Sequence, residues 1–308
     1  MCLKRGAEIF ASDRGKSRER GPLEFKSHLV EREGDLGLLC RKDVITVYSS
    51  TRIEEAIEEM VRAKIKKLPV IDAGTKRLLG MVTSYDIADF LGGGEKHNII
   101  TKRHNGNYLS AINEPVREIM ASDIPRAYVE ESLEEAMERL VKSKYTGMPV
   151  LDENDRVVGI ITERDFIKPI AGLETGISVR DVMTEEVLTL PPGAPLIDAM
   201  RAMVRNVFRR IPITSEGSLL GIITTIDILS HFIEKETFSK IRSSGLEIVL
   251  NEEISRLMTK EVITVSPDKD VGYASKIMLD REIGGLPVLS NGELVGIVTE
   301  KDVISSFI

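Results

Sequence analysis

The stretch that decides the fold lies near the end of the chain and runs from Leu286-Pro287-Val288 to Gly296-Ile297-Val298-Thr299-Glu300-Lys301-Asp302. Its pattern occurs four times in 308 residues, and the aspartate always follows the glycine by six positions. An alanine precedes the proline by 13 residues in every copy. Self-similarity at fixed spacings is the signature of a repeat architecture, so we expect four copies of one structural unit.

Each copy carries a hydrophobic-Pro-hydrophobic step followed by a Thr-x-x-Asp motif. The prolines are Pro69, Pro149, Pro212 and Pro287. The motifs hold Thr83 and Asp86, Thr162 and Asp165, Thr224 and Asp227, and Thr299 and Asp302. A further threonine lies before the first helix of three copies, at Thr46, Thr189 and Thr264, whereas the second copy has Arg126 there, preceded by Pro125.

The order of elements within a copy follows from its apolar pattern. The segment before the proline is apolar at helical spacing, as in Ile53, Ala56 and Met60, and short apolar runs follow it. Proline is tolerated at the start of a strand, and Asn291-Gly292 is typical of a two-residue hairpin turn. Strands are also expected before the first helix, at 44–47 and 262–265. The predicted unit is β-α-β-β-α.

These motifs resemble cystathionine-β-synthase (CBS) domains, from about Gly37 to Ile308. With four copies, and with Phe90–Gly94 leading to Ala111–Met120, the chain is similar to archaeal proteins related to the nucleotide-sensing γ subunit of AMP-activated protein kinase. The resemblance implies an α/β (α+β) fold in which four repeats form two pseudo-twofold pairs and a disk. It also implies adenine-nucleotide sites between partners, although CBS pairs also hold S-adenosyl compounds or nothing.

The predicted boundaries follow the repeats. They are an arm at 1–35, disordered or extended because it is polar and aperiodic, repeat 1 at 36–95, a linker at 96–115, repeat 2 at 116–174, repeat 3 at 175–236, a linker at 237–253 and repeat 4 at 254–308. From each motif aspartate to the next repeat's alanine the chain runs 50, then 34, then 47 residues, which indicates a duplicated pair. The helices after Thr-x-x-Asp are strongly apolar, and we expect them to pack repeat 1 on repeat 2 and repeat 3 on repeat 4.

Composition excludes several classes of protein. A net charge of −7 argues against broad nucleic-acid binding, and no apolar run reaches the length of a membrane helix or resembles a signal peptide, so we expect a cytoplasmic protein. Cys40 is predicted to be a small core residue. The four histidines lack metal-ligand spacing, and Gly92-Gly93-Gly94 is interpreted as a helix stop with a flexible bend rather than a phosphate cradle. We therefore expect neither an enzyme nor a metal site.

The repeated motifs suit an adenine nucleotide. Apolar strands around the prolines offer walls for a flat purine, a carboxylate at a helix N-terminus can accept hydrogen bonds from both ribose hydroxyls, and the threonine favours phosphate. The resemblance implies the same roles for the four aspartates. Cations adjacent to the motifs could neutralise phosphates: Lys66, Lys67, Arg209 and Arg210 in the odd repeats, and Arg164 and Lys301 in the even ones.

The alternatives are structural. Thr-x-x-Asp before an apolar helix is close to a capping box, although capping alone would accept other residue types as readily. The cations also suit solvated helix ends, and Pro125 and Arg126 put the second site in doubt. We expect an energy-sensing regulatory protein, a homodimer, that binds AMP, ADP or ATP and responds through a kinase-like or other effector. The rivals are a scaffold with empty sites and a binder of S-adenosylmethionine or methylthioadenosine.

Overall fold

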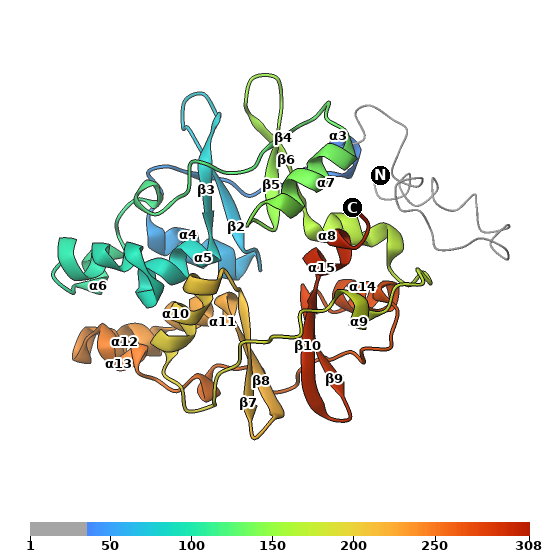
Figure 1. Ribbon diagram of the computed structural model, residues 1–308. Helices are drawn as coiled ribbons and strands as arrows, with labels where there is room; N and C mark the ends of the chain where they lie inside the picture. Colours follow the sequence, from blue (N-terminus) through green and yellow to red (C-terminus); the bar gives the residue numbers. More distant parts are fainter. Residues whose placement is uncertain (1–35) are drawn as a thin grey trace. The chain divides into compact units, whose positions relative to one another are not determined.

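A computed structural model describes residues 36–308 of the chain, so the predicted arm at 1–35 lies outside the described residues. The described chain divides into two units (Figure 1). The odd unit, Ile45–Ile124 with Leu188–Val262, holds most of repeats 1 and 3. The even unit, residues 36–44, Pro125–Val187 and Ile263–Ile308, holds most of repeats 2 and 4.

The repeats follow the predicted order of elements. Repeat 1 contains β1 (Val47–Tyr48), α4 (Ile53–Arg62), β2 (Lys67–Ile71), β3 (Leu78–Thr83) and α5 (Ser84–Ala88). Repeat 2 contains β4 (Ala127–Tyr128), α7 (Leu133–Lys142), β5 (Gly147–Leu151), β6 (Val157–Thr162) and α8 (Glu163–Ile167). Repeat 3 contains α10 (Leu196–Asn206), β7 (Arg210–Ser215), β8 (Ser218–Thr224) and α11 (Thr225–Phe232), and repeat 4 contains α14 (Val271–Asp280), β9 (Gly285–Ser290), β10 (Glu293–Thr299) and α15 (Glu300–Ser305).

The first strand of each repeat is shorter than predicted. It spans two residues in repeats 1 and 2 and shrinks to single parallel bridges, Leu190 to Ile213 and Val265 to Val288, in repeats 3 and 4. A few residues earlier the chain is paired with a different repeat, as in the bridge between Thr259 and Ile222. Because the segment before the first helix is first paired with another repeat, only its last residues join the sheet of its own repeat.

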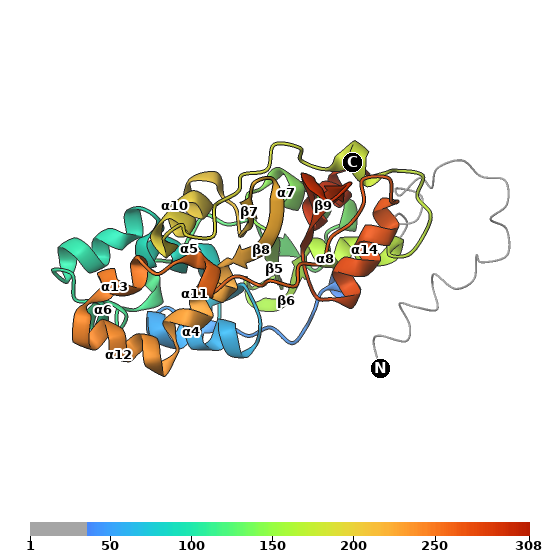
Figure 2. The same cartoon turned by 90° about the horizontal axis from the view of Figure 1, so that it is seen from below.

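Short elements connect the repeats. They are α6 (Tyr108–Ala111), α9 (Val179–Val182), α12 (Lys235–Ser244) and α13 (Leu246–Leu250), with the helical turns η1 (Asp89–Gly93), η2 (Glu95–His97), η3 (Ile99–Arg103), η4 (Val116–Glu118), η5 (Lys168–Ile170) and η6 (Ile254–Arg256). A further helix, α3 (Leu36–Leu39), precedes β1. Within the odd unit the two linkers meet, since the rings of Tyr108 and Phe238 lie 6.2 Å apart (Figure 2). Two-residue turns close two of the hairpins, and Asn291 and Gly292 both have the positive φ that the sequence predicted.

The helices after Thr-x-x-Asp do not pair the repeats as predicted. In the odd unit α5 packs on α11, so repeat 1 meets repeat 3, and in the even unit α8 packs on α15, so repeat 2 meets repeat 4. The pairing of 1 with 2 and of 3 with 4 through these helices is therefore wrong. The disk stays a prediction. The apolar surface of these helices indicates that another element covers them, but it does not identify that element.

The first helical residues of the paired repeats meet where the helices pack. In the odd unit the Ser84 and Thr225 hydroxyl oxygens lie 2.8 Å apart and both side chains are buried. At the equivalent positions of the even unit, Glu163 and Glu300 are buried, and Arg164 Nε donates to Glu300 Oε1 at 2.8 Å. The paired helices thus bring two hydroxyl groups together in the odd unit, and in the even unit they place a cation beside buried glutamates.

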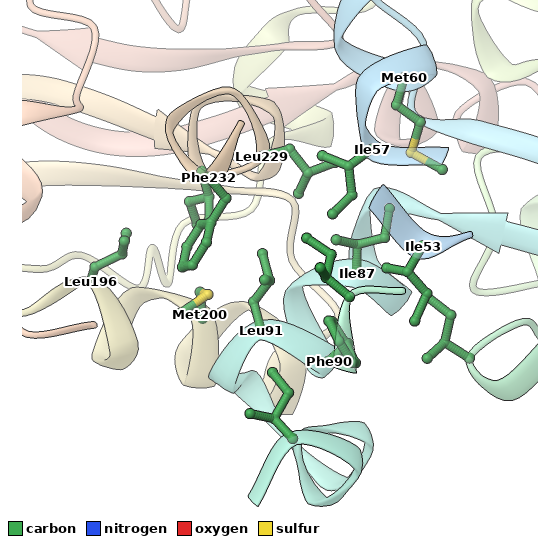
Figure 3. Close-up of a cluster of buried hydrophobic side chains, with 14 of the residues drawn as sticks. Ile53, Ile57, Met60, Ile87, Phe90, Leu91, Leu196, Met200, Leu229 and Phe232 are labelled. Carbon is green, nitrogen blue, oxygen red and sulfur yellow. The ribbon is translucent and has the colours of Figure 1, made fainter. Parts of the chain in front are cut away.

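The odd-unit core lies between its four main helices. Figure 3 shows Ile57 of α4, Ile87 of α5, Met200 of α10 and Leu229 of α11 in one cluster, and these side chains are fully buried. The even unit has a separate cluster drawn from α7, α8, α14 and α15. Each unit therefore contains its own core, and the apolar stripes predicted for the repeats' helices are buried there.

The glycine of each Gly-to-Asp segment makes room for a lead-in from another repeat. A Cβ at Gly159 would lie 2.5 Å from Cys40 Sγ, and one at Gly221 would lie 2.6 Å from Met258 Sδ. At Gly80 the obstacle is backbone, with the Ala121 carbonyl oxygen only 2.3 Å away. Cys40 is buried, which confirms its prediction as a small core residue.

The Gly92-Gly93-Gly94 segment is more closely packed than predicted. The helical turns end there, and Gly92 and Gly93 are buried against α10, whereas Gly94 is exposed. A Cβ at Gly93 would lie 2.4 Å from Val204 Cγ2. The helix stop is therefore confirmed, while Gly92 and Gly93 let the turn and α10 approach closely; the flexibility of the bend stays a prediction.

Replacing Ser84 by Ala is expected to lower the free energy of unfolding by about 1–2 kcal/mol, because the buried Thr225 hydroxyl loses its partner. Thr225→Val should cost a similar amount, and the double variant should cost less than the sum of the two. Urea unfolding of the four proteins in this cycle measures the coupling. Additive effects would show that the hydroxyl contact does not specify the pairing.

Candidate functional site

The structure brings the predicted site residues of repeat 1 to one end of one sheet. β2 is the central strand, with β1 parallel and β3 antiparallel to it. Lys67 at the start of β2 pairs with Thr83 at the end of β3, and the Lys66 carbonyl accepts from Ser84 N. Thr46 directly precedes Val47, which pairs with the residue after Pro69. The residues predicted for this site therefore lie together, although Thr46 and Asp86 are 40 positions apart in the sequence.

The same convergence recurs in the other repeats. In repeat 3 Arg210 pairs with Thr224 and the Arg209 carbonyl accepts from Thr225 N, while Leu190, next to Thr189, bridges to Ile213. In repeat 4 Gly285 pairs with Thr299, and Val265, next to Thr264, bridges to the residue after Pro287. Repeat 2 has the same register, Gly147 with Thr162, but exposed Arg126 replaces the threonine. Pro149 and Pro212 occupy the positions of Pro69 in their strands.

Each Thr-x-x-Asp motif forms a capping box. In repeat 3 the Asp227 Oδ2 atom accepts from Thr224 N at 2.7 Å and from Thr224 Oγ1 at 2.7 Å, and Asp227 N donates back to that hydroxyl at 3.4 Å. Equivalent contacts occur for Asp86, Asp165 and Asp302. The cap therefore occupies one carboxylate oxygen and orients the other, so capping and ligand binding do not exclude one another.

The second carboxylate oxygen has different surroundings in different repeats. Lys96 Nζ contacts Asp86 Oδ1, and Lys168 Nζ contacts Asp165 Oδ1 at 2.6 Å. Within residues 36–308, Asp227 Oδ1 makes no hydrogen bond or ion pair. Asp227 instead lines a surface hollow of about 460 Å³ between α11, α12 and η6. Of these three aspartates, Asp227 is the one whose second oxygen has no partner among the described residues.

The wall of this hollow is polar and largely held in place by its own contacts. His231 Nε2 lies 2.9 Å from Glu252 Oε2, and Lys240 Nζ lies 3.1 Å from Glu252 Oε1. Arg256, which is exposed, also lines the hollow and forms no ion pair with the described residues. The Asp227 carboxylate, with one oxygen unpaired within the described part of the chain, and the Arg256 guanidinium thus line the same space, an arrangement able to receive a diol and an anion.

The predicted cations divide into two kinds. Lys66, Lys67, Arg209 and Arg210 lie beside the motifs at the strand starts, as described above. Arg164 instead binds Glu300, and Lys301 Nζ donates to the Ser143 carbonyl at 2.6 Å. In this structure the two even-repeat cations therefore hold protein groups, and a phosphate would have to compete for them.

Sequence reasoning missed Lys96, Arg256 and the His231–Glu252 pair. Lys96 and Glu252 belong to the linkers between repeats, and Arg256 stands in a lead-in where the other repeats have different residues. No motif marks these positions. The signal that could have found Lys96 was the glycine run directly before it, which folds the chain back.

Burial shifts two ionisable groups near the repeat 1 motif. It raises the pKa of Tyr85, whose hydroxyl donates to the Val204 carbonyl at 2.5 Å, and nearby Asp89 and Asp86 raise it further, while Arg209 opposes the shift. Burial also raises the pKa of Asp89, against a hydrogen bond from the Lys96 backbone N–H. Arg209 of repeat 3 therefore lies near Tyr85 of repeat 1.

Two further properties bear on function. Among residues 36–308 no cluster of three or more His, Cys, Asp or Glu residues could hold a metal ion. No helix in the same part of the chain has the length and apolar character needed to cross a bilayer.

Four segments of the chain, residues 34–93, 116–172, 179–234 and 253–308, match the CBS domain. The chain belongs to the CBS-domain family. The predicted resemblance and the α/β fold of four repeats are thereby confirmed, and each repeat above is one CBS domain.

Proteins of similar length are among the relatives. The chain is 37% identical over 268 residues to MJ1225, an uncharacterised protein of Methanocaldococcus jannaschii, spanning 86% of this chain and 96% of that one. The crystal structure of MJ1225, a protein proposed to be an archaeal homologue of γ-AMPK, superposes with a TM-score of 0.84 and covers 88% of this chain and 98% of that one. A 33.4 kDa protein encoded in a ribosomal RNA operon of Thermofilum pendens is 34% identical over 84% of this chain and 86% of its own.

Proposed function

We propose that this CBS-domain protein is a regulatory sensor that binds the adenine nucleotides AMP, ADP or ATP and couples their binding to a partner protein or to its own association. The observation that carries the proposal is the Asp227 carboxylate, which is oriented by Thr224 through one oxygen, has no partner among the described residues for the other, and lines a hollow. A vicinal diol is a natural partner for such an oxygen, because both hydroxyls can donate to a charged acceptor.

The surroundings of the motif favour a phosphorylated nucleoside over a plain sugar. Arg209 and Arg210 lie at the start of β7 beside Thr224, and Arg256 lines the hollow. The relative proposed as an archaeal γ-AMPK homologue supports an energy-sensing role for this chain. The partner we envisage is a kinase-like or other effector, with a homodimer in the cytoplasm as the working unit.

Equilibrium dialysis of the full chain tests the proposal. The protein is dialysed against equal concentrations of AMP, ADP, ATP, S-adenosylmethionine and methylthioadenosine, and the retained compounds are quantified by mass spectrometry. We expect an adenine nucleotide to be retained. Retention of the S-adenosyl compounds alone would assign the sites to that class, and retention of nothing would leave an interaction scaffold.

The positive charge of Arg210 at the repeat 3 motif is expected to strengthen the binding of phosphate groups but not of the nucleoside. Arg210→Ala should weaken ATP binding by about tenfold and leave adenosine within about twofold, because only ATP carries the charge that a guanidinium meets. Raised salt should weaken ATP binding in the same direction. Calorimetric titration measures both ligands, and exposed Arg205→Ala in the same unit is the control. Equal losses for ATP and adenosine would mean that Arg210 only shapes the fold.

A further inference from the structure

The linker after α5 folds back onto the motif of repeat 1. Gly94 permits the turn, since a Cβ there would lie 2.7 Å from Asp89 Oδ1. The same Asp89 oxygen accepts from Lys96 N at 2.9 Å, and His97 Nδ1 lies 3.0 Å from the Phe90 carbonyl oxygen. These contacts fix the backbone of the segment, and they place the Lys96 ammonium on Asp86 Oδ1.

The contact engages the remaining oxygen of the Asp86 carboxylate. Asp86 Oδ2 accepts from Thr83 N at 2.8 Å and from Thr83 Oγ1 at 2.6 Å, and Oδ1 holds Lys96. The Asp86 side chain is only 8% exposed, whereas that of Lys96 is 26% exposed. With the ammonium in place, Oδ1 can no longer accept from both hydroxyls of a ribose, so a bound diol would have to displace Lys96.

The equivalent aspartate of the same unit has no such occupant. Asp227 keeps its cap but borders the hollow, and the chain after α11 continues into α12 without returning a lysine to Oδ1. The lysine that contacts Asp165 differs from Lys96. Lys168 follows Asp165 by only three positions, and its side chain is 56% exposed. The linker of repeat 1 therefore makes two otherwise equivalent motifs unequal.

We propose that Lys96 is a specificity-determining residue that closes the repeat 1 motif to ribose-bearing ligands, so that the odd unit binds them at Asp227 first. The inference rests on the proposed function. When the competent state is a minor fraction of the population, the apparent dissociation constant rises by the inverse of that fraction. A lysine that is displaced one-tenth of the time thus weakens the site about tenfold.

Lys96→Met tests this in the full chain, because methionine keeps most of the apolar stem and removes the ammonium. Calorimetric titration with AMP should show one additional site, or one site at least about tenfold tighter than in the parent. Adding Asp86→Asn to Lys96→Met should remove the gain. Lys102→Met, an exposed lysine of the same linker, is the matched control and should titrate like the parent. If Lys96→Met fails to fold, Lys96→Gln keeps a neutral donor to Asp86 and should give the same direction.

The outcomes separate this inference from the function on which it rests. A parent that binds AMP and a Lys96 variant with unchanged stoichiometry and affinity would overturn the closure alone. Weaker binding in the variant would also overturn it, by showing that Lys96 holds the ligand. A parent and a variant that both bind no adenine nucleotide would overturn the proposed function and the closure together.

Discussion

Asp227→Asn is expected to weaken adenine-nucleotide binding at the repeat 3 motif by about tenfold to more than a hundredfold. Hydrogen bonds to a charged group contribute about 1.5–3 kcal/mol each, and a ribose diol can donate two of them to Asp227 Oδ1. The observed stoichiometry should therefore fall by about one site at ligand concentrations that saturate the parent. Calorimetric titration with AMP and ATP measures the change.

Folding should survive this substitution. The cap needs an acceptor for Thr224 N and Oγ1, both 2.7 Å from Asp227 Oδ2, and the asparagine carbonyl can supply it. The helix then loses only the interaction between the Asp227 charge and the helix dipole, which contributes a few tenths to about 1 kcal/mol. Thermal melting checks that the variant stays folded, and Asp198→Asn in the first turn of α10 is the control. Binding unchanged by Asp227→Asn would leave the motif as a helix cap and favour the scaffold class.

The four aspartates are not expected to respond alike. The sequence put only the second site, that of Asp165, in doubt, because Pro125 and Arg126 precede its first helix. The contact between Lys96 and Asp86 changes this expectation for Asp86, whose replacement should remove little binding while the lysine is present. Asp227 is therefore the most informative single substitution.

The sequence predicted local structure well because local structure depends on spacing. The four repeats, the β-α-β-β-α order and the position of Thr-x-x-Asp at a helix start all follow from periodic apolar residues and turn chemistry. The convergence of Thr46, Lys67 and Thr83 follows in turn from strand register. These features require only neighbours that the same repeat supplies.

The pairing of repeats could not be predicted in the same way. It depends on contacts between residues far apart in the chain, Ser84 with Thr225 and Arg164 with Glu300, which are 141 and 136 residues apart. Sequence patterns show that a helix has an apolar face, but they do not show which other helix packs against that face. The occupation of Asp86 by Lys96 was missed for a related reason, since the linker carries no repeat pattern that assigns its side chains a place.

The exchange of lead-ins between repeats gives the largest expected effect on stability. Met81 and Ala121 exchange two backbone hydrogen bonds of 2.9 Å, and Gly80 faces the Ala121 carbonyl directly. A methyl group at Gly80 would lie 2.3 Å from that oxygen, so one backbone segment must move. The lead-in of repeat 2 would then lose its place on the sheet of repeat 1.

Gly80→Ala is therefore expected to lower the free energy of unfolding by about 3 kcal/mol, at the upper end of typical overpacking effects, because neither backbone can relax without losing hydrogen bonds. Urea unfolding followed by circular dichroism measures the loss. Gly74→Ala, in the turn of the same hairpin, is the matched control, since its Cβ would meet only Asp72 Oδ1 at 3.6 Å. The control should unfold within about 0.5 kcal/mol of the parent. Equal stability of the two variants would show that the lead-in adapts to a side chain at Gly80, and that close backbone approach does not explain why every repeat carries a glycine there.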